Sequence, residues 1–141
     1  MILRGLSFVI AAVLTAAPLA QSPAREQLAR GRALWDQRLA QSAIAALERA
    51  ARNKETAAEA HEALGRIYTF KGWQQESVFP GWHDEPAFRA LALTELRAAL
   101  AADPNRASAQ EALRTAEAFA AAEKVDPAPP REDSPLLSSA R

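Results

Sequence analysis

The feature that most constrains this chain is an apolar pattern that recurs with a period of 34 residues. Gly31 and Gly65 are 34 positions apart, and each precedes a similar set of small and apolar residues. The two sets are Ala43, Leu47 and Ala50 after Gly31, and Ala92, Leu96 and Ala99 after Gly65. The spacing within each set is the same, but the second set starts 15 residues later relative to its glycine. A fixed period of this length predicts stacked helical hairpins, with an insertion inside the second hairpin.

Helical spacing of apolar residues predicts an all-α fold with five helices within residues 24–124. The expected helices cover residues 22–39, 41–52, 56–70, 86–102 and 105–123. The alanines of the two repeated sets should lie where neighbouring helices pack closely.

Local signals mark the expected ends of these helices. Ser22 is a good N-cap for the first helix, and Pro23 suits its first turn. Thr56 and Glu59 match a capping box at the start of the third helix. Lys71-Gly72 should end that helix, and Asp103-Pro104 should end the fourth.

The arrangement resembles the tetratricopeptide repeat family. The matching features are Leu64-Gly65 followed by Tyr68, the two alanine–leucine sets, and Asp103-Pro104. The resemblance covers about residues 24–122 and implies two repeats with an insertion in the second, followed by a capping helix. Gln27 and His61 stand where the family usually has a large aromatic residue, which is a departure from its pattern.

In that family the first helix of each hairpin lines a concave groove that binds a partner peptide. Carried over by helical phase, the resemblance implies the groove residues Leu28, Arg32, Trp35, Glu62, Arg66 and Phe70. Arg32 and Arg66 share the 34-residue spacing, so they either bind a carboxylate of a partner or pair with nearby carboxylates such as Asp36 and Glu62. The lysine- and asparagine-rich clamp of some family members is not reproduced, so its ligand is not implied.

Residues 72–86 form an insertion rich in aromatic side chains. Two glycines and two prolines predict a loop, and its tryptophans predict an ordered flap. Either this flap covers a short helical stack whose hydrophobic core is too small, or it is a surface that recognises a partner. The partner-binding residues of the second hypothesis are Trp73, Phe79, Trp82 and His83. An alternative function is a small-ligand or carbohydrate site that uses Trp73 and Trp82 as stacking platforms.

Sequence features give little support for catalysis, cofactors or metals. The chain has no cysteine, and no phosphate-binding loop or nucleophile elbow is found. His83-Asp84-Glu85 and His61-Glu62 do not match a metal motif, and a capping role for Asp84 or Glu85 explains the first group better. The formal net charge is zero and there is no basic stripe, which disfavours nucleic acid as a partner.

The two ends predict export and a tail. Residues 1–20 resemble a signal peptide, with Arg4 before an apolar run at residues 5–14, and cleavage as late as Ala24 is compatible with the sequence. About ten apolar residues are too few to span a bilayer, which needs roughly 20, so no stable membrane insertion is expected after cleavage. A retained N-terminal anchor is the alternative. Residues 125–141 are proline-rich and should be a disordered tail.

Together these patterns predict a periplasmic or secreted interaction module or scaffold, not an enzyme. Its partner would be a protein, a peptide or a larger envelope complex. Two hairpins and a capping helix are fewer than the roughly three repeats that such a stack usually needs for stability. A self-associating structural subunit is therefore a further hypothesis.

Overall fold

The computed structural model describes residues 21–74 and 85–123, and these residues form only helices and their connections. The elements are α1 (Pro23–Asp36), α2 (Ala40–Ala51), α3 (Ala57–Thr69), the π-helical turn η1 (Phe70–Gln74), α4 (Glu85–Ala102) and α5 (Ala107–Glu123). The prediction of an all-α fold is confirmed for this part of the chain. The predicted signal peptide, most of the insertion and the predicted tail lie outside the described residues.

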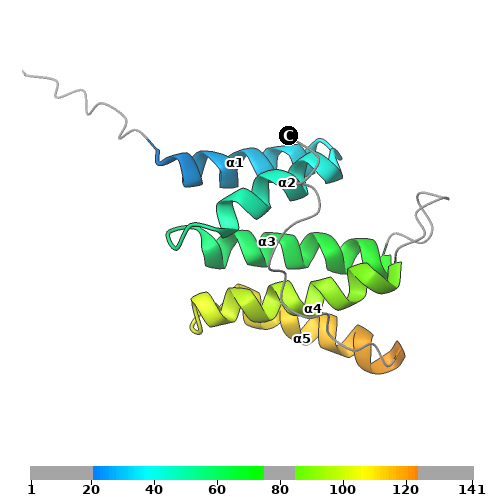
Figure 1. Cartoon of the computed structure of the whole chain (residues 1–141). Helices are drawn as coiled ribbons and strands as arrows, with labels where there is room; N and C mark the ends of the chain where they lie inside the picture. Colours follow the sequence, from blue (N-terminus) through cyan, green and yellow to red (C-terminus); the bar gives the residue numbers. More distant parts are fainter. Residues whose placement is uncertain (1–20, 75–84, 124–141) are drawn as a thin grey trace, which may run out of the picture.

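The helices stack in chain order, from α1 at the top of Figure 1 to α5 at the bottom. The pairs α1–α2 and α3–α4 make extensive contacts, and α5 packs on α4. Helix α3 also contacts α1, α2 and α5, so it is the centre of the stack. A side chain on α3 can therefore reach residues from both ends of the described domain.

The two glycines of the repeated pattern occupy equivalent contacts. A Cβ atom built on Gly31 would lie 2.6 Å from Cγ of Leu47, and one built on Gly65 would lie 2.4 Å from Cγ of Leu96. Any larger residue would collide there, so glycine sets the distance between the helices of each pair. Ala43, Ala50, Ala92 and Ala99 are all fully buried. The predicted common register of the two hairpins is confirmed.

The start of α1 agrees with the sequence signals. Ser22 is the N-cap, and its Oγ accepts a hydrogen bond of 3.3 Å from the backbone N–H of Arg25. The helix ends at Asp36, three residues earlier than predicted. The connection that follows contains Arg38 at a φ of 64°, which reverses the chain sharply enough for α2 to begin at Ala40.

The predicted capping box at the start of α3 is wrong. Thr56 is fully buried, and its hydroxyl donates a 2.6 Å hydrogen bond to the carbonyl oxygen of Ala50 near the end of α2. The Glu59 carboxylate binds Arg25 and Arg32 instead of the backbone N–H of Thr56. The physical reason is that the last carbonyls of a helix have no intrahelical partner, and Thr56 lies close enough to satisfy one of them.

The predicted end of the third helix near Phe70 is confirmed to within one residue, because α3 ends at Thr69, but Lys71-Gly72 does not stop the helical path. The helical path continues through η1, where Lys71 is buried and its Nζ lies 4.4 Å from the centre of the Phe88 ring. Burial lowers the pKa of Lys71 to about 8. The carbonyl oxygen of Gly72 accepts a 2.6 Å hydrogen bond from Nε of Arg89. A Cβ on Gly72 would lie 2.8 Å from Arg89 Cγ, so this glycine permits close packing on α4 and is not a helix terminator.

The remaining boundaries differ little from the expectation. The fourth helix begins at Glu85 and ends at Ala102 before Asp103-Pro104, as predicted to within one residue. The fifth begins at Ala107, two residues later than predicted. In the described ranges, no helix combines the length and the apolar character needed to cross a membrane.

Candidate functional site

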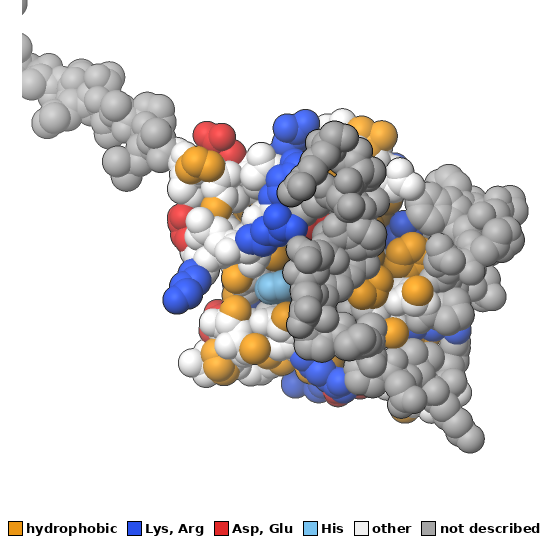
Figure 2. Space-filling view, in the orientation of Figure 1, with side chains coloured by type: hydrophobic (Ala, Val, Ile, Leu, Met, Phe, Trp, Pro, Cys, Tyr) orange, Lys and Arg blue, Asp and Glu red, His pale blue; other side chains and the backbone are white. Residues whose placement is uncertain are grey.

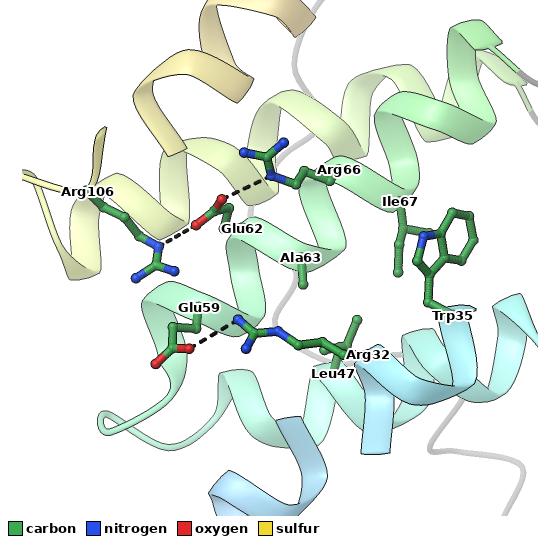
Figure 3. A pocket seen from close by; sticks show the side chains of 9 residues that line it. All are labelled: Arg32, Trp35, Leu47, Glu59, Glu62, Ala63, Arg66, Ile67 and Arg106. Carbon is green, nitrogen blue, oxygen red and sulfur yellow. Dashed lines mark hydrogen bonds and ion pairs between the residues drawn. The ribbon is translucent and has the colours of Figure 1, made fainter. Parts of the chain in front are cut away.

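A pocket of about 270 Å³ opens on the side of the stack where α1 and α3 meet. Figure 3 shows its lining residues, which are Arg32 and Trp35 of α1, Leu47 of α2, Glu59, Glu62, Ala63, Arg66 and Ile67 of α3, and Arg106 just before α5. Helix α3 contributes the largest share because residues three and four positions apart lie on one helical face.

Four of the six predicted groove residues line this pocket: Arg32, Trp35, Glu62 and Arg66. Leu28 lies in the hydrophobic core instead and is only 3% exposed. Phe70 packs the edge of its ring against Trp35, with 5.6 Å between ring centroids and an angle of 79°. It therefore supports the orientation of Trp35 from beside the pocket.

Sequence reasoning missed five lining residues. Glu59, Ala63 and Ile67 share the face of α3 that carries Glu62 and Arg66, so helical periodicity was a sufficient signal for them. The other two are Leu47 and Arg106, which belong to different elements. Only the packing of α2 and α5 on α3 brings these two to the pocket.

Glu62 is the centre of the polar side of the pocket. Its Oε1 accepts a 3.0 Å hydrogen bond from Nε of Arg66, and its Oε2 accepts from Nε of Arg106 and, at 3.0 Å, from Oγ of Ser108. Burial by itself would raise the pKa of Glu62, but the hydrogen bonds from Arg106, Arg66 and Ser108 outweigh it and hold the pKa below its usual value. Glu62 is thus an ionised anchor that joins α3 to α5.

A second carboxylate, Glu59, joins α3 to α1. Its Oε1 accepts from Nη1 of Arg25, and its Oε2 lies 3.1 Å from Nη2 of Arg32. Burial would raise the pKa of Glu59, but the pairing with Arg25 and Arg32 lowers it below the ordinary value. The hypothesis that Arg32 and Arg66 pair with nearby carboxylates of the chain therefore holds in part. Arg32 pairs with Glu59, and Arg66 pairs with Glu62, as predicted.

The other side of the pocket is apolar. In Figure 3, Trp35 and Ile67 face each other at one side, whereas the arginines and glutamates lie toward the other, with Ala63 between them. Ile67 is 3% exposed and Leu47 is fully buried, so these side chains are held in place by the packing of the core. The pocket therefore combines apolar side chains with charged groups within about one helical turn.

His61 does not line this pocket. His61 follows a different face of α3, and its Nδ1 lies 2.7 Å from Oε2 of Glu95 on α4. This contact links the two helices of the second hairpin. His83 lies outside the described residues, as do Phe79 and Trp82 of the predicted flap.

Trp73 is the one predicted flap residue that the structure describes. Its ring stacks on Phe119 of α5, with centroids 5.5 Å apart and an interplanar angle of 21°, and the Arg89 guanidinium lies 6.0 Å from its centroid. It packs against both hydrophobic clusters of the core. Its indole N–H is buried without a hydrogen-bond partner in the described part of the chain. Trp73 therefore packs against the core, in agreement with the hypothesis that the insertion covers a short helical stack.

The described surface visible in Figure 2 is mixed in character. On the face shown in Figure 2, basic, acidic and hydrophobic side chains of the described residues are interspersed. This pattern accords with the zero formal net charge of the chain.

Comparison with protein-family models, with curated proteins and with solved structures found no match for this chain. The pocket and its chemistry are therefore the basis for assigning a function.

Proposed function

We propose that this protein is an exported interaction module that binds a segment of a partner protein in the pocket between α1 and α3. The observation that carries the proposal is the combination of an apolar wall, Trp35 and Ile67, with two half-exposed arginines, Arg32 and Arg66. Tryptophan and arginine are the residues that most often dominate the energy of protein interfaces.

The size of the pocket is compatible with part of a protein segment. At about 270 Å³, it lies at the lower edge of the roughly 300–1,000 Å³ of typical small-molecule sites. Such a volume suits one or two side chains of a longer segment, while the rest of the segment lies along the surface. This argument supports a peptide or protein partner.

We further propose a tetratricopeptide-like organisation for the stack. The 34-residue period and the equivalent Gly31–Leu47 and Gly65–Leu96 contacts support it. In such a stack the first helices of the hairpins, here α1 and α3, carry the binding surface, and these two helices supply most of the pocket. A location in the periplasm or outside the cell is part of the same proposal and rests on the signal-like residues 1–20.

The carbohydrate alternative has less support. It needs an open aromatic platform at Trp73 and Trp82, but Phe119 covers one face of the Trp73 ring. Trp82 lies outside the described residues. We therefore propose no sugar site, and no catalytic residue, cofactor or metal.

Affinity capture tests the proposal. The mature protein and a Trp35→Ala/Arg66→Ala variant are used as baits in a native envelope extract, and captured proteins are identified by mass spectrometry. We expect the variant to lose the main partner at least tenfold, because anchors of this kind contribute about 2 kcal/mol or more each.

A matched control keeps the comparison specific. Leu39→Ala/Arg97→Ala removes an exposed apolar side chain and an exposed arginine that do not line the pocket. This control should capture the partner as the wild type does, and circular dichroism should show that both variants remain helical. Equal capture by the pocket variant and the wild type would mean that partners bind elsewhere.

A further inference from the structure

The charged groups that a ligand would meet in this pocket differ from a simple count of its charged residues. Three arginines and two glutamates line it, a nearly balanced set. However, the side chains of Glu62 and Glu59 are 9% and 23% exposed, whereas those of Arg32 and Arg66 are 50% and 53% exposed. The guanidinium groups of Arg32 and Arg66 are therefore more exposed than the carboxylates they pair with, so an approaching ligand meets mainly positive charge.

The hydrogen bonding strengthens this asymmetry. Both oxygens of Glu62 and both oxygens of Glu59 already accept from arginines, and Ser108 adds another donor to Glu62. The negative charge of each carboxylate is therefore already paired with arginine, which leaves less attraction for a cationic ligand.

Contacts with the described residues use only some of the donors of Arg32 and Arg66. A guanidinium has five N–H groups. Among the described residues, one N–H of Arg32 bonds to Glu59, and two of Arg66 bond to Glu62 and to the carbonyl oxygen of Ser108. The remaining N–H groups suit an acceptor that carries negative charge, and a planar carboxylate matches their fork geometry best.

We infer that the segment bound in this pocket is acidic and apolar at once: it presents a carboxylate side chain to Arg32 and Arg66, and a bulky apolar side chain to Trp35 and Ile67. This inference rests on the proposed function and specifies its partner. A basic segment would meet the exposed guanidinium groups and find only carboxylates that are less exposed and already paired with arginines, so it is disfavoured by charge.

The geometry of α3 limits the spacing of the two side chains. Ala63 and Ile67 are separated by a helical rise of about 6 Å and Arg66 lies between them, so the charged and apolar parts of the pocket lie within about one turn of each other. Side chains on one face of an extended segment repeat every two residues, about 6.6 Å. On a helical segment, residues three or four apart are about 5–6 Å apart. The acidic and apolar residues of the partner should therefore be two to four positions apart.

A randomised peptide library provides the test. Twelve-residue segments are displayed inside a carrier loop, so that no free chain end is available, and are selected on the full chain. We expect enrichment of Asp or Glu two to four positions from Leu, Ile, Met, Phe or Trp. An end-blocked synthetic copy of the strongest binder should lose about tenfold or more in affinity when its acidic residue is changed to the amide.

Variants of the protein locate the effect. Arg32→Gln/Arg66→Gln should weaken the same peptide by a similar factor, and added salt should weaken binding to the wild type. The matched control is Arg97→Gln/Arg114→Gln, which changes two exposed arginines that pair with Glu117 and Glu111 away from the pocket. This control should bind as the wild type does.

The outcomes separate the inference from the proposed function. Binders that depend on Trp35 but lack acidic residues, or that are enriched in Lys and Arg, would overturn the acidic assignment and leave a peptide-binding pocket in place. If no selected peptide loses affinity on Trp35→Ala, the pocket is not a peptide site, and both proposals fail.

Discussion

Individual residues set the distances within this stack, and the two repeated glycines do so most clearly. A glycine inside a helix costs about 1 kcal/mol relative to alanine. Gly31 and Gly65 nevertheless occupy helix interiors, because the side chains of Leu47 and Leu96 fill the space that a Cβ would need. At these positions the requirement for close packing outweighs the intrinsic helix propensity.

We predict that Gly65→Ala destabilises the protein. The 2.4 Å approach to Cγ of Leu96 should cost about 1–3 kcal/mol in overpacking, and the gain of about 1 kcal/mol in helix propensity offsets only part of the upper range. Urea unfolding followed by circular dichroism should show a net loss of up to about 2 kcal/mol, and Gly31→Ala should have the same sign.

A double-mutant cycle with Leu96→Ala serves as the control for this contact. The two changes should be less than additive, because alanine at position 96 removes the atoms that the new methyl group would meet. A stabilising Gly65→Ala would show that the helices are not packed as closely as the structure places them.

At the scale of elements, the connection from α2 to α3 contains a capping-box sequence whose side chains bond to other helices instead of capping α3. Thr56-x-x-Glu59 has the composition of a capping box, but both side chains have partners in other helices. Thr56 is buried against the end of α2, and Glu59 faces the arginines of α1. Each side chain therefore joins two elements, which a local motif cannot indicate.

We predict that Thr56→Val weakens this connection. Valine keeps the shape of the side chain but removes the 2.6 Å hydrogen bond to the carbonyl oxygen of Ala50, which should lower the free energy of unfolding by about 1 kcal/mol. Thr56→Ser keeps the hydroxyl and should preserve that hydrogen bond, so it is the matched variant in the same urea experiment. A Thr56→Val variant as stable as the wild type would show that this hydrogen bond does not contribute to stability.

For the whole molecule, ion pairs on α3 connect the two ends of the described stack. Glu59 binds arginines of α1, and Glu62 binds Arg106 at the start of α5 as well as Arg66 of its own helix. The pKa of each carboxylate is below its ordinary value in the folded protein, because the arginine partners outweigh the effect of burial. The charges that shape the pocket also hold the hairpins together.

We predict that acid destabilises the fold through these two carboxylates. Their pKa values are lower in the folded than in the unfolded chain, so the unfolded chain binds more protons at mildly acidic pH. The free energy of unfolding should therefore fall as pH drops from about 4.5 through the folded pKa values. Glu62→Gln should flatten this dependence and lower stability at neutral pH, as measured by urea unfolding between pH 3 and pH 7.

The matched control for the acid experiment is Glu111→Gln, which changes a side chain that is 75% exposed. It should leave the pH dependence close to that of the wild type, because exposed ion pairs contribute little. An unchanged slope in Glu62→Gln would mean that Glu62 does not contribute to acid unfolding.

Several features followed from the sequence alone because they depend on short-range physics. Helical spacing of Leu64, Ile67 and Tyr68, the Ser22 cap and the Asp103-Pro104 break act over a few residues, and the all-α prediction depends on them. The repeated Gly31 and Gly65 also predicted which leucines would share a register. Four residues of the pocket were predicted from the resemblance to the tetratricopeptide repeat family, which was carried over to this chain by helical phase.

Only the tertiary structure decided what these side chains contact. The sequence placed Leu28 in the groove, but the packing of α1 buries it in the core. Arg106 reaches Glu62 across 44 residues, and no local pattern indicates such a pair. Packing of the helices also leaves the guanidinium groups of Arg32 and Arg66 more exposed than the carboxylates of Glu59 and Glu62. Charge and periodicity can be read along a chain, whereas desolvation depends on which helices meet.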